Sequence, residues 1–181
     1  SGVTTIGEDA FSGGSKLTSI TVSEENTVYQ SINGNLYSKD GKTLIRYAKG
    51  KTAIRFVVPE GVTTIGYCAV AGCSNLTRLE IGDNVTAIGE GAFASCYNLT
   101  GMVTLEGVTT IGNGAFSSCS RLVSVVIGNG VTAIGNGAFS GCSKLTNVYY
   151  KGTASEWANI SIGSNIYERA NPTTYFYVEN E

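Results

Sequence analysis

Regularly spaced cysteines are the residues of this chain whose types and positions most readily suggest chemistry. Four of them recur every 23 residues, at Cys73, Cys96, Cys119 and Cys142. Zinc ligands come instead in close pairs that converge on one tetrahedral centre, which a linear column of thiols cannot do. Neighbouring thiols could come within disulfide reach, although their parallel side-chain vectors disfavour the bond. We therefore predict a buried column of small apolar side chains, with Cys68 outside it as the strongest candidate for a free thiol.

The usual catalytic residues are missing or scattered. The sequence has no histidine, which removes the Ser-His-Asp and Cys-His schemes together with the commonest metal ligand. Glycine-rich pieces such as residues 112–114 recur without the lysine of a phosphate loop. The carboxylates fall mostly at turn or outward positions, and a glycosidase pair such as Glu80 and Glu106 would need a cleft holding them about 5–9.5 Å apart. We predict no catalytic residue, no metal and no cofactor.

Composition narrows the classes of partner. The 181 residues carry a net charge of −2 with 14% charged residues, so there is no basic surface for nucleic acid or anionic lipid. No apolar run approaches the roughly 18 residues of a membrane span, and the N-terminus lacks a signal-peptide pattern. Twenty-four glycines against two prolines are typical of regular tight turns. We expect a folded, soluble chain that is a mature or trimmed piece, without its signal peptide or neighbouring domains.

The interval between the cysteines belongs to a longer repeat. The motif V-T-[TA]-I-G-x-x-A-[FV]-x-x-[GC]-x-x-L starts five times, near residues 3, 62, 85, 108 and 131. Residues 122–127 alternate as a strand does, Val-Thr-x-Ile forms a second extended piece, and residues 113–118 allow one or two helical turns. A coil of this size buries its apolar residues only by stacking on others, about 4.7–4.9 Å apart. The sequence therefore predicts a repeat solenoid of short parallel strands with short helical or 3-10 turns.

The repeat resembles the BspA-like leucine-rich repeats of bacterial surface proteins, most clearly over residues 108–119 and Leu122. The resemblance covers nearly the whole chain and implies a solenoid of the leucine-rich-repeat type. It extends to residues 31–44, which resemble the hairpin unit that interrupts such arrays. Asp40 and Gly41 support a hairpin turn on physical grounds, because glycine readily adopts positive φ.

The end of the chain also resembles this family. From Tyr149 the pattern is similar to the family's terminal segment, with a short helix that starts at Thr153 or Ser155 and carries Trp157, and a last strand over residues 173–178 that helps to cover the core. We thus expect one solenoid over residues 1–181, with a hairpin insert at about 27–60 and a C-terminal cap at about 149–181. Residues 3–22 are either an uncovered edge or preceded by further repeats.

A solenoid binds its partners with the side chains that its strands present outward. Two rows are expected in register, and they are Ser19, Arg78, Gly101, Ser124 and Asn147, then Thr21, Glu80, Val103, Val126 and Tyr149. We predict a partner-binding face of Arg78, Glu80, Val103, Val126 and Tyr149 that becomes apolar toward the C-terminus, although strand packing explains the same residues nearly as well. Thr104 stands where neighbouring units have isoleucine, and a bulge there would turn Val103 and Leu105 inward.

Two further sets of residues are assigned structural roles. Thr63, Thr86, Thr109 and Thr132 form a column, for which we predict an outward ladder that stabilises the sheet. Tyr29, Tyr37 and Tyr47 surround the expected hairpin and either contact a partner or cover the core where the repeat is broken. We favour cover.

The resemblance implies a bacterial surface or secreted interaction module, non-catalytic, that binds an extracellular protein or glycan in an adhesion-like way. The shared motif is the structural skeleton, so no binding residue is carried over from it. The alternative is a passive spacer within a larger surface protein. An enzyme fragment is disfavoured, and a tight cluster of unlike polar groups in one pocket would revive it. We expect an extracellular or cell-surface location, further domains or repeats in the natural chain, and neither nucleic-acid binding nor membrane insertion.

Overall fold

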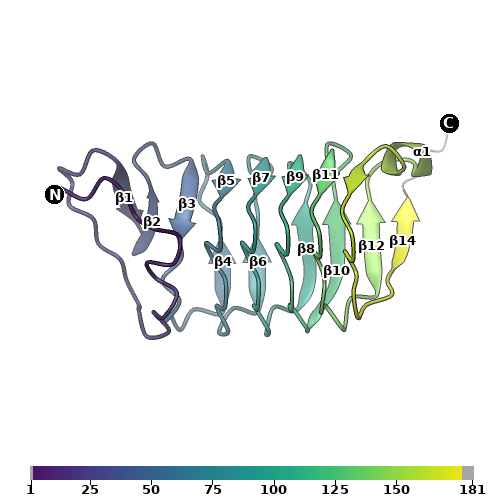
Figure 1. Cartoon of the computed structure of the whole chain (residues 1–181), viewed down its shortest axis with the longest axis horizontal. Coiled ribbons are helices and arrows are strands. Elements are labelled where there is room, and N and C mark those ends of the chain that lie inside the picture. Colours follow the sequence, from purple (N-terminus) through teal and green to yellow (C-terminus); the bar gives the residue numbers. More distant parts are fainter. Residues whose placement is uncertain (1, 177–181) are drawn as a thin grey trace.

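The computed structural model describes residues 2–176 as a row of coils stacked along one axis (Figure 1). Each coil of the regular part contributes a two-residue strand to one face and a longer strand to another. The strands are β1 (Tyr29–Ile32), β2 (Asn35–Ser38), β3 (Thr43–Arg46), β4 (Arg55–Val57), β5 (Thr64–Ile65), β6 (Arg78–Glu80), β7 (Ala87–Ile88), β8 (Gly101–Leu105), β9 (Thr110–Ile111), β10 (Leu122–Ile127), β11 (Ala133–Ile134), β12 (Asn147–Tyr150), β13 (Ser161–Ile162) and β14 (Thr173–Phe176). One helix, α1 (Ala154–Trp157), lies between β12 and β13.

Parallel pairing between successive coils builds the sheets. The first sheet has the order β1-β2-β3-β5-β7-β9-β11-β13, antiparallel within the hairpin β1 to β3 and parallel from β3 onward. The longer strands lie on a second side of the coils. They form two sheets, the pair β4-β6 and the parallel sheet β8-β10-β12-β14. This architecture confirms the predicted repeat solenoid of stacked parallel strands.

The third side of each coil consists of turns, which corrects the prediction of helical or 3-10 turns. The amide of Ala115 donates to the carbonyl of Gly112 within its own coil, whereas the amides of Gly114 and Phe116 donate to Asn136 and Ala138 of the next coil. A helix would need consecutive amides for its own ladder. Since alternate amides bind the neighbouring coil instead, no helix forms, and Gly114 takes a positive φ of 56°. Within residues 2–176, no helix is long and apolar enough to cross a membrane.

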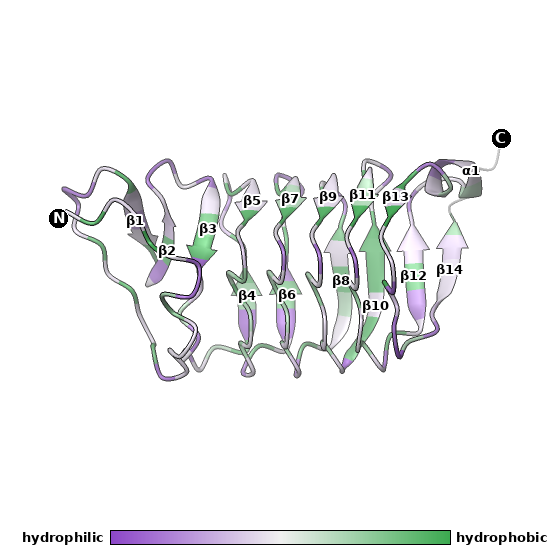
Figure 2. Cartoon of the chain, in the orientation of Figure 1, coloured by the Kyte–Doolittle hydropathy of each residue, from purple (hydrophilic) through white to green (hydrophobic). Residues whose placement is uncertain are grey.

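Columns of identical apolar residues fill the interior along the axis. Figure 2 shows hydrophobic residues on the short strands of successive coils and along β10. Phe116 is fully buried, and its ring stacks on Phe93 and Phe139 at centroid distances of 5.0 and 5.4 Å. A second column, also buried, consists of Ile65, Ile88, Ile111 and Ile134. The apolar residues of the repeated motif are therefore those that pack against the equivalent residues of the next coil.

The hairpin β1 to β3 interrupts the array near the N-terminus. Tyr37 and Tyr47 are 0% and 3% exposed, and the ring centroids of Tyr47 and Phe56 are 4.7 Å apart. Both tyrosines therefore cover the core where the repeat is broken, as predicted. Tyr29 is half-buried and donates a hydrogen bond from its hydroxyl to the carbonyl of Thr4. The insert thus takes the place that a regular coil would occupy.

Near the other end, Thr153 is the N-cap of α1, one of the two starts that the sequence allows. Its hydroxyl accepts from the amide of Glu156, and the Glu156 carboxylate accepts from the amide of Thr153, which makes a capping box. Trp157 packs against Tyr150 and Phe176 at centroid distances of 5.1 and 6.3 Å. The last strand runs over Thr173–Phe176, and the part of the predicted strand beyond it lies outside the described residues.

We expect Thr153→Ala to lower the free energy of unfolding by about 1 kcal/mol, because the first turn of α1 loses its N-cap hydroxyl. Thr153→Ser keeps the hydroxyl and is expected to stay close to the wild type. Urea unfolding followed by circular dichroism measures both, and equal losses in the two variants would contradict a role for the cap.

Candidate interaction face

The outward face is charged at β4 and β6. Arg78 and Glu80 lie exposed on β6 at their predicted outward positions, opposite Arg55 and Val57 of β4. The Arg55 guanidinium donates from Nε and Nη2 to the two carboxylate oxygens of Glu80, both at 2.6 Å. These hydrogen bonds lower the pKa of the Glu80 carboxyl and raise that of Arg55. Arg78 forms no ion pair among residues 2–176, and its nearby charge also contributes to the lowered pKa of Glu80.

This ion pair predicts a small dependence of stability on acid. The pKa of Glu80 is lower in the folded chain than in the unfolded chain, so the pair stabilises the fold at neutral pH and loses that effect as pH falls through the folded pKa. Glu80→Gln should slightly flatten the curve of unfolding free energy against pH in the acidic range. Solvent screening keeps the effect small, since both side chains are about half exposed. Urea unfolding across pH measures it, with Glu60→Gln as a control that leaves the pair intact.

The third repeat departs from the predicted register. Val103 is 1% exposed and pairs with the inward Val125, and Leu105 is fully buried opposite Ile127. Val103 is thus wrongly placed on the partner-binding face. The physical reason is a register shift between Leu122 and Ser124, which the sequence allowed as its alternative.

Met102 takes the outward position that the shift opens. It is 56% exposed and pairs with Ser124, and Gly101 beside it has a φ of 79°. A shallow cleft of about 310 Å³ lies here between β6 and β8 and is lined by Arg78, Glu80 and Met102 among others. The irregular repeat therefore divides the outward face and exposes a flexible apolar side chain at the division. The substitution at Thr104 was the one signal for it in the sequence.

From β8 to β14 the outward face is uncharged and partly aromatic. Tyr149 stacks on Tyr175 with a centroid distance of 5.1 Å and an angle of 19°, and Tyr175 is 46% exposed. Val126 lies on this face as predicted but is only 8% exposed, because Thr104 and Tyr149 flank it on the paired strands. Val126 therefore offers little surface. Tyr175 was missed because the outward rows were not extended into the last strand.

The cysteine column has a structural role. Cys73, Cys96, Cys119 and Cys142 are at most 2% exposed, and all five cysteines are free thiols. The thiols of Cys96, Cys119 and Cys142 donate to the carbonyls of Val70, Phe93 and Phe116 in the preceding coils, at 3.1–3.2 Å. Burial raises the pKa of Cys73 and Cys96 to about 12, which keeps them protonated. Within residues 2–176, no group of three or more potential ligands could hold a metal ion.

The threonine column is an outward ladder, as predicted, and its bonds run from side chain to backbone. The hydroxyls of Thr86, Thr109 and Thr132 donate to the carbonyls of the threonines one coil earlier, at 2.9–3.4 Å. These hydrogen bonds connect successive coils. The column is accounted for without a ligand.

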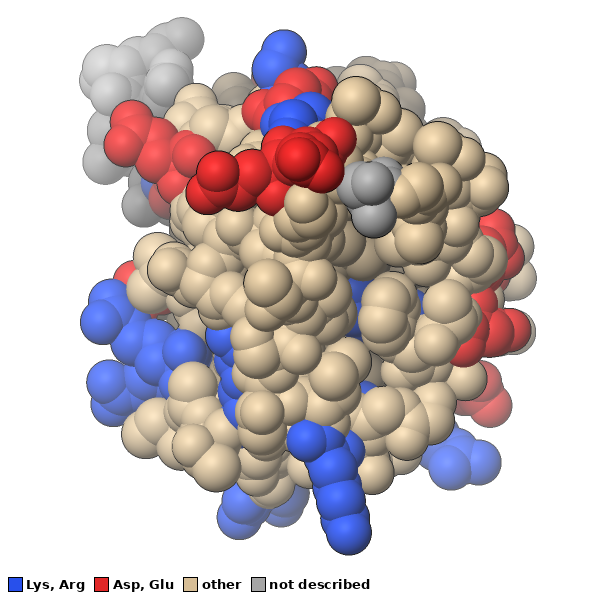
Figure 3. Space-filling model, turned by 90° about the vertical axis from the view of Figure 1, so that its left-hand side faces the viewer, with Lys and Arg blue, Asp and Glu red and all other residues tan. Residues whose placement is uncertain are grey.

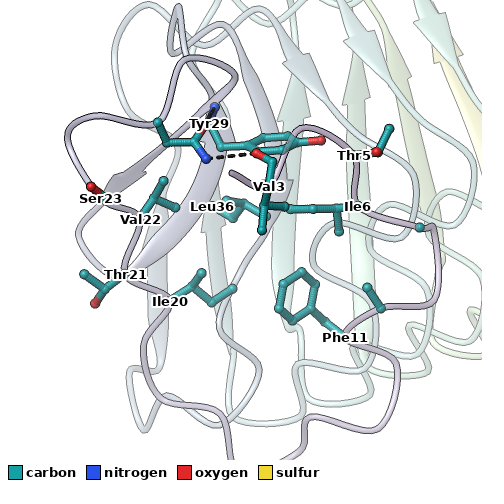
Figure 4. Close-up of a pocket in the computed structure, with 13 residues that line it drawn as sticks. Val3, Thr5, Ile6, Phe11, Ile20, Thr21, Val22, Ser23, Tyr29 and Leu36 are labelled. Carbon is teal, nitrogen blue, oxygen red and sulfur yellow. Dashed lines mark hydrogen bonds between the residues drawn. The ribbon is translucent and has the colours of Figure 1, made fainter. Parts of the chain in front are cut away.

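Three cavities occur where the first repeat meets the insert, and sequence reasoning found none of them. The largest of the three, of about 480 Å³, opens at the N-terminal end and is lined mainly by apolar side chains such as Ile6, Phe11 and Ile20 (Figure 4). Viewed from this end, charged residues lie mostly around the periphery of a largely uncharged surface (Figure 3). A second cavity of about 230 Å³, which we call the seam cavity, is lined by Asp9, Phe11, Ser12, Arg46, Lys49, Cys68, Ala71, Gly72, Ala94 and Ser95. Its residues come from the first repeat, from the end of the insert and from the next two coils, which are hydrogen-bonded to each other.

Comparisons with known proteins identify relatives of this architecture. A family model described as the BspA type leucine rich repeat region matches six copies over residues 1–54 and 45–171. No curated protein matches the chain. A leucine rich cell surface protein from Faecalibacterium prausnitzii A2-165 is 30% identical with a TM-score of 0.62, over 80% of this chain and 44% of that one. A leucine-rich repeat protein from Eubacterium ventriosum ATCC 27560 is 26% identical with a TM-score of 0.65, over 87% and 43%.

A third solved structure shares the fold alone. The pneumococcal vaccine antigen PcpA is 22% identical with a TM-score of 0.74, over 90% of this chain and 40% of that one. The chain therefore spans less than half the length of each of these three structures.

Proposed function

Because the chain belongs to the BspA-type leucine-rich repeat family, we propose that it is a non-catalytic binding module of a bacterial surface protein, with an adhesion-like function. In this proposal, the outward side of the strands from β4 to β14 binds an extracellular protein or glycan. The relative from Faecalibacterium prausnitzii is described as a cell surface protein, which supports an extracellular or cell-surface location for this chain. The other two solved relatives support the fold on which the proposal rests.

The observation that carries the proposal is the contrast between the outward face and the rest of the coil. Interior and turn positions repeat from coil to coil, because each residue stacks on its own counterpart. The outward positions instead change, from Arg78 through Met102 to Tyr149 and Tyr175. Met102 and Tyr175 are exposed apolar side chains in an ordered sheet, and such residues on a rigid surface are typical of interfaces.

Support for a non-catalytic role comes from the family, whose fold is a repeat scaffold, and from the residue types present. The seam cavity does bring unlike polar groups together, namely Asp9, Arg46, Lys49 and Cys68. The sequence has no histidine, and Asp9 is exposed. We therefore treat the cavity as a place for binding and assign no reaction to it.

We also propose that further repeats or domains accompany this chain in the natural protein. The chain spans 40–44% of the three solved relatives. The apolar cavity at the N-terminal end has the shape and chemistry to pack against another coil.

The test is binding of the purified chain to an immobilised panel of extracellular-matrix proteins and glycans. A Met102→Ser, Tyr175→Ala double variant removes exposed apolar surface from the face, and Tyr97→Ala removes a comparably exposed aromatic ring elsewhere. Saturable binding that is lost in the double variant and kept in the control would support the proposal. Absence of binding at tens of micromolar would favour the alternative, a passive spacer that separates other domains.

A further inference from the structure

We propose that the seam cavity binds an oxyanion, meaning a carboxylate, sulfate or phosphate group. The cavity lies between the turn of the first repeat, the end of the hairpin insert and the turns of the next two coils. It does not overlap the outward face, so this inference is independent of the proposed function. Its volume of about 230 Å³ accommodates one small acidic group.

A buried guanidinium is the first reason. Arg46 is 8% exposed, and no carboxylate within residues 2–176 forms an ion pair with it. Its Nη1 and Nη2 donate to the carbonyls of Cys68 and Glu8 at 2.5 and 3.2 Å, and its buried Nε has no hydrogen-bond partner. Carbonyl oxygens satisfy donors without neutralising the charge. A buried cation without a counter-ion is costly, and an anion in the cavity would supply one.

Lys49 places a second positive charge at the same cavity. It is half-buried and forms no hydrogen bond or ion pair with the described part of the chain. Its Nζ lies so close to Gly72 that a Cβ on that glycine would be 2.6 Å away. The ammonium group is therefore held against the cavity wall and does not extend freely into solvent. Ser12 and Ser95 line the same space and add hydroxyl groups that can donate to an oxyanion.

Two acidic side chains near the seam cavity oppose the binding of an anion. Asp9 lines the cavity, and Glu8 lines the neighbouring cavity that Arg46 shares. Both residues are exposed, so solvent screens their charges more than that of the buried guanidinium. Asp9 should therefore weaken anion binding without preventing it. Removal of the Asp9 charge should therefore strengthen anion binding, whereas removal of the Lys49 charge should weaken it.

Cys68 provides a reporter in the cavity itself. It is half-buried, whereas the other four cysteines are buried. The thiolate of Cys68 attacks an aromatic disulfide, forms a mixed disulfide and releases one aromatic thiolate, which is followed by absorbance. We would compare the dianionic reagent 5,5′-dithiobis(2-nitrobenzoate) with the neutral 4,4′-dithiodipyridine. The neutral reagent corrects for access to the thiol and for its intrinsic reactivity, and Cys68→Ser identifies the signal.

We expect the ratio of anionic to neutral reaction rates to fall about tenfold in Lys49→Met, as for loss of local electrostatic attraction. Asp9→Asn should raise the ratio, and Lys144→Met, which removes a lysine outside the cavity, should leave it unchanged. Sodium sulfate should slow the anionic reagent more than sodium chloride does at equal ionic strength. The same ratio in wild type and Lys49→Met, or equal effects of the two salts, would overturn the proposal.

Calorimetric titration distinguishes the sources of the acidic group. Inorganic sulfate and phosphate test the free ion, whereas a sulfated disaccharide and a sialyl-lactose test the group carried on a glycan. Binding of either kind that Lys49→Met removes supports the site, and its absence for all four probes contradicts it. The double variant of the outward face should retain this binding, which separates failure of the site from failure of the proposed function.

Discussion

Replacement of Phe116 by alanine is expected to lower the free energy of unfolding by about 3–5 kcal/mol. The side chain is fully buried at the centre of a column, between Phe93 and Phe139. Its removal leaves a cavity that the flanking rings cannot fill, because hydrogen bonds between coils fix the backbone on both sides. Stacking on two neighbours adds to the loss from burial. Urea denaturation followed by far-ultraviolet circular dichroism measures the change.

The position of Phe116 also predicts the form of the transition. In a linear array each coil contacts only its neighbours, so weakening of a middle coil uncouples the two ends. The urea transition of Phe116→Ala should therefore be broader as well as earlier. Tyr97→Ala, at an aromatic residue that is 51% exposed, should change stability by less than about 0.5 kcal/mol. A loss under about 1 kcal/mol at Phe116 would show that the column is not tightly packed.

Sequence reasoning recovers most of this fold because the same positions are buried in every regular coil. An error at one position would have to recur in each unit, so the columns of isoleucine, phenylalanine and cysteine identify the interior by their constant interval. The same regularity predicted the threonine ladder. The cover by Tyr37 and Tyr47 was predicted from the break in the repeat, and Thr153 was one of two helix starts predicted in the terminal segment. Burial and hydrogen bonding confirm these assignments.

The error in strand register falls where one repeat differs from the others. Val103 was assigned by counting from the neighbouring units, and the shift between β8 and β10 displaces that count by one residue. Because strand side chains alternate, a displacement of one residue exchanges inward and outward positions. The local sequence allowed both registers. Burial of Val103 and Leu105 together with Val125 decides between them, and that contact spans two coils.

The turns and the seam cavity show a different limit. Residues 113–118 are compatible with helical turns when considered alone, and the competition for their amides comes from the next coil. The approach of Arg46 and Lys49 to residues 9–12 depends on how the insert fits between two coils. No periodicity reports such a contact, since the residues belong to parts of the chain that do not repeat. The turns and the seam cavity both depend on contacts between coils, which only the three-dimensional structure shows.

Glycine at the end of the Val-Thr-x-Ile-Gly segment is required by the close approach of successive backbones. A Cβ at Gly112 would lie 2.5 Å from the amide nitrogen of Glu90 and 2.6 Å from the carbonyl carbon of Gly89. The same approach recurs at Gly135, where a Cβ would lie 2.5 Å from the amide nitrogen of Asn113. Main-chain atoms of a hydrogen-bonded ladder cannot move aside as a flexible side chain can. An alanine here must push two coils apart.

We therefore expect Gly112→Ala to destabilise the fold by about 3 kcal/mol, the upper end of the usual cost of overpacking. Gly130→Ala is the matched control, because a Cβ at Gly130 meets nothing within 4 Å. The control should be neutral or slightly stabilising, since alanine restricts the unfolded chain more than glycine does. Thermal and urea unfolding of the two variants measure the difference. Equal stability of Gly112→Ala and Gly130→Ala would mean that the coils separate easily, and the spacing between them would then not be the constraint that places glycine in every repeat.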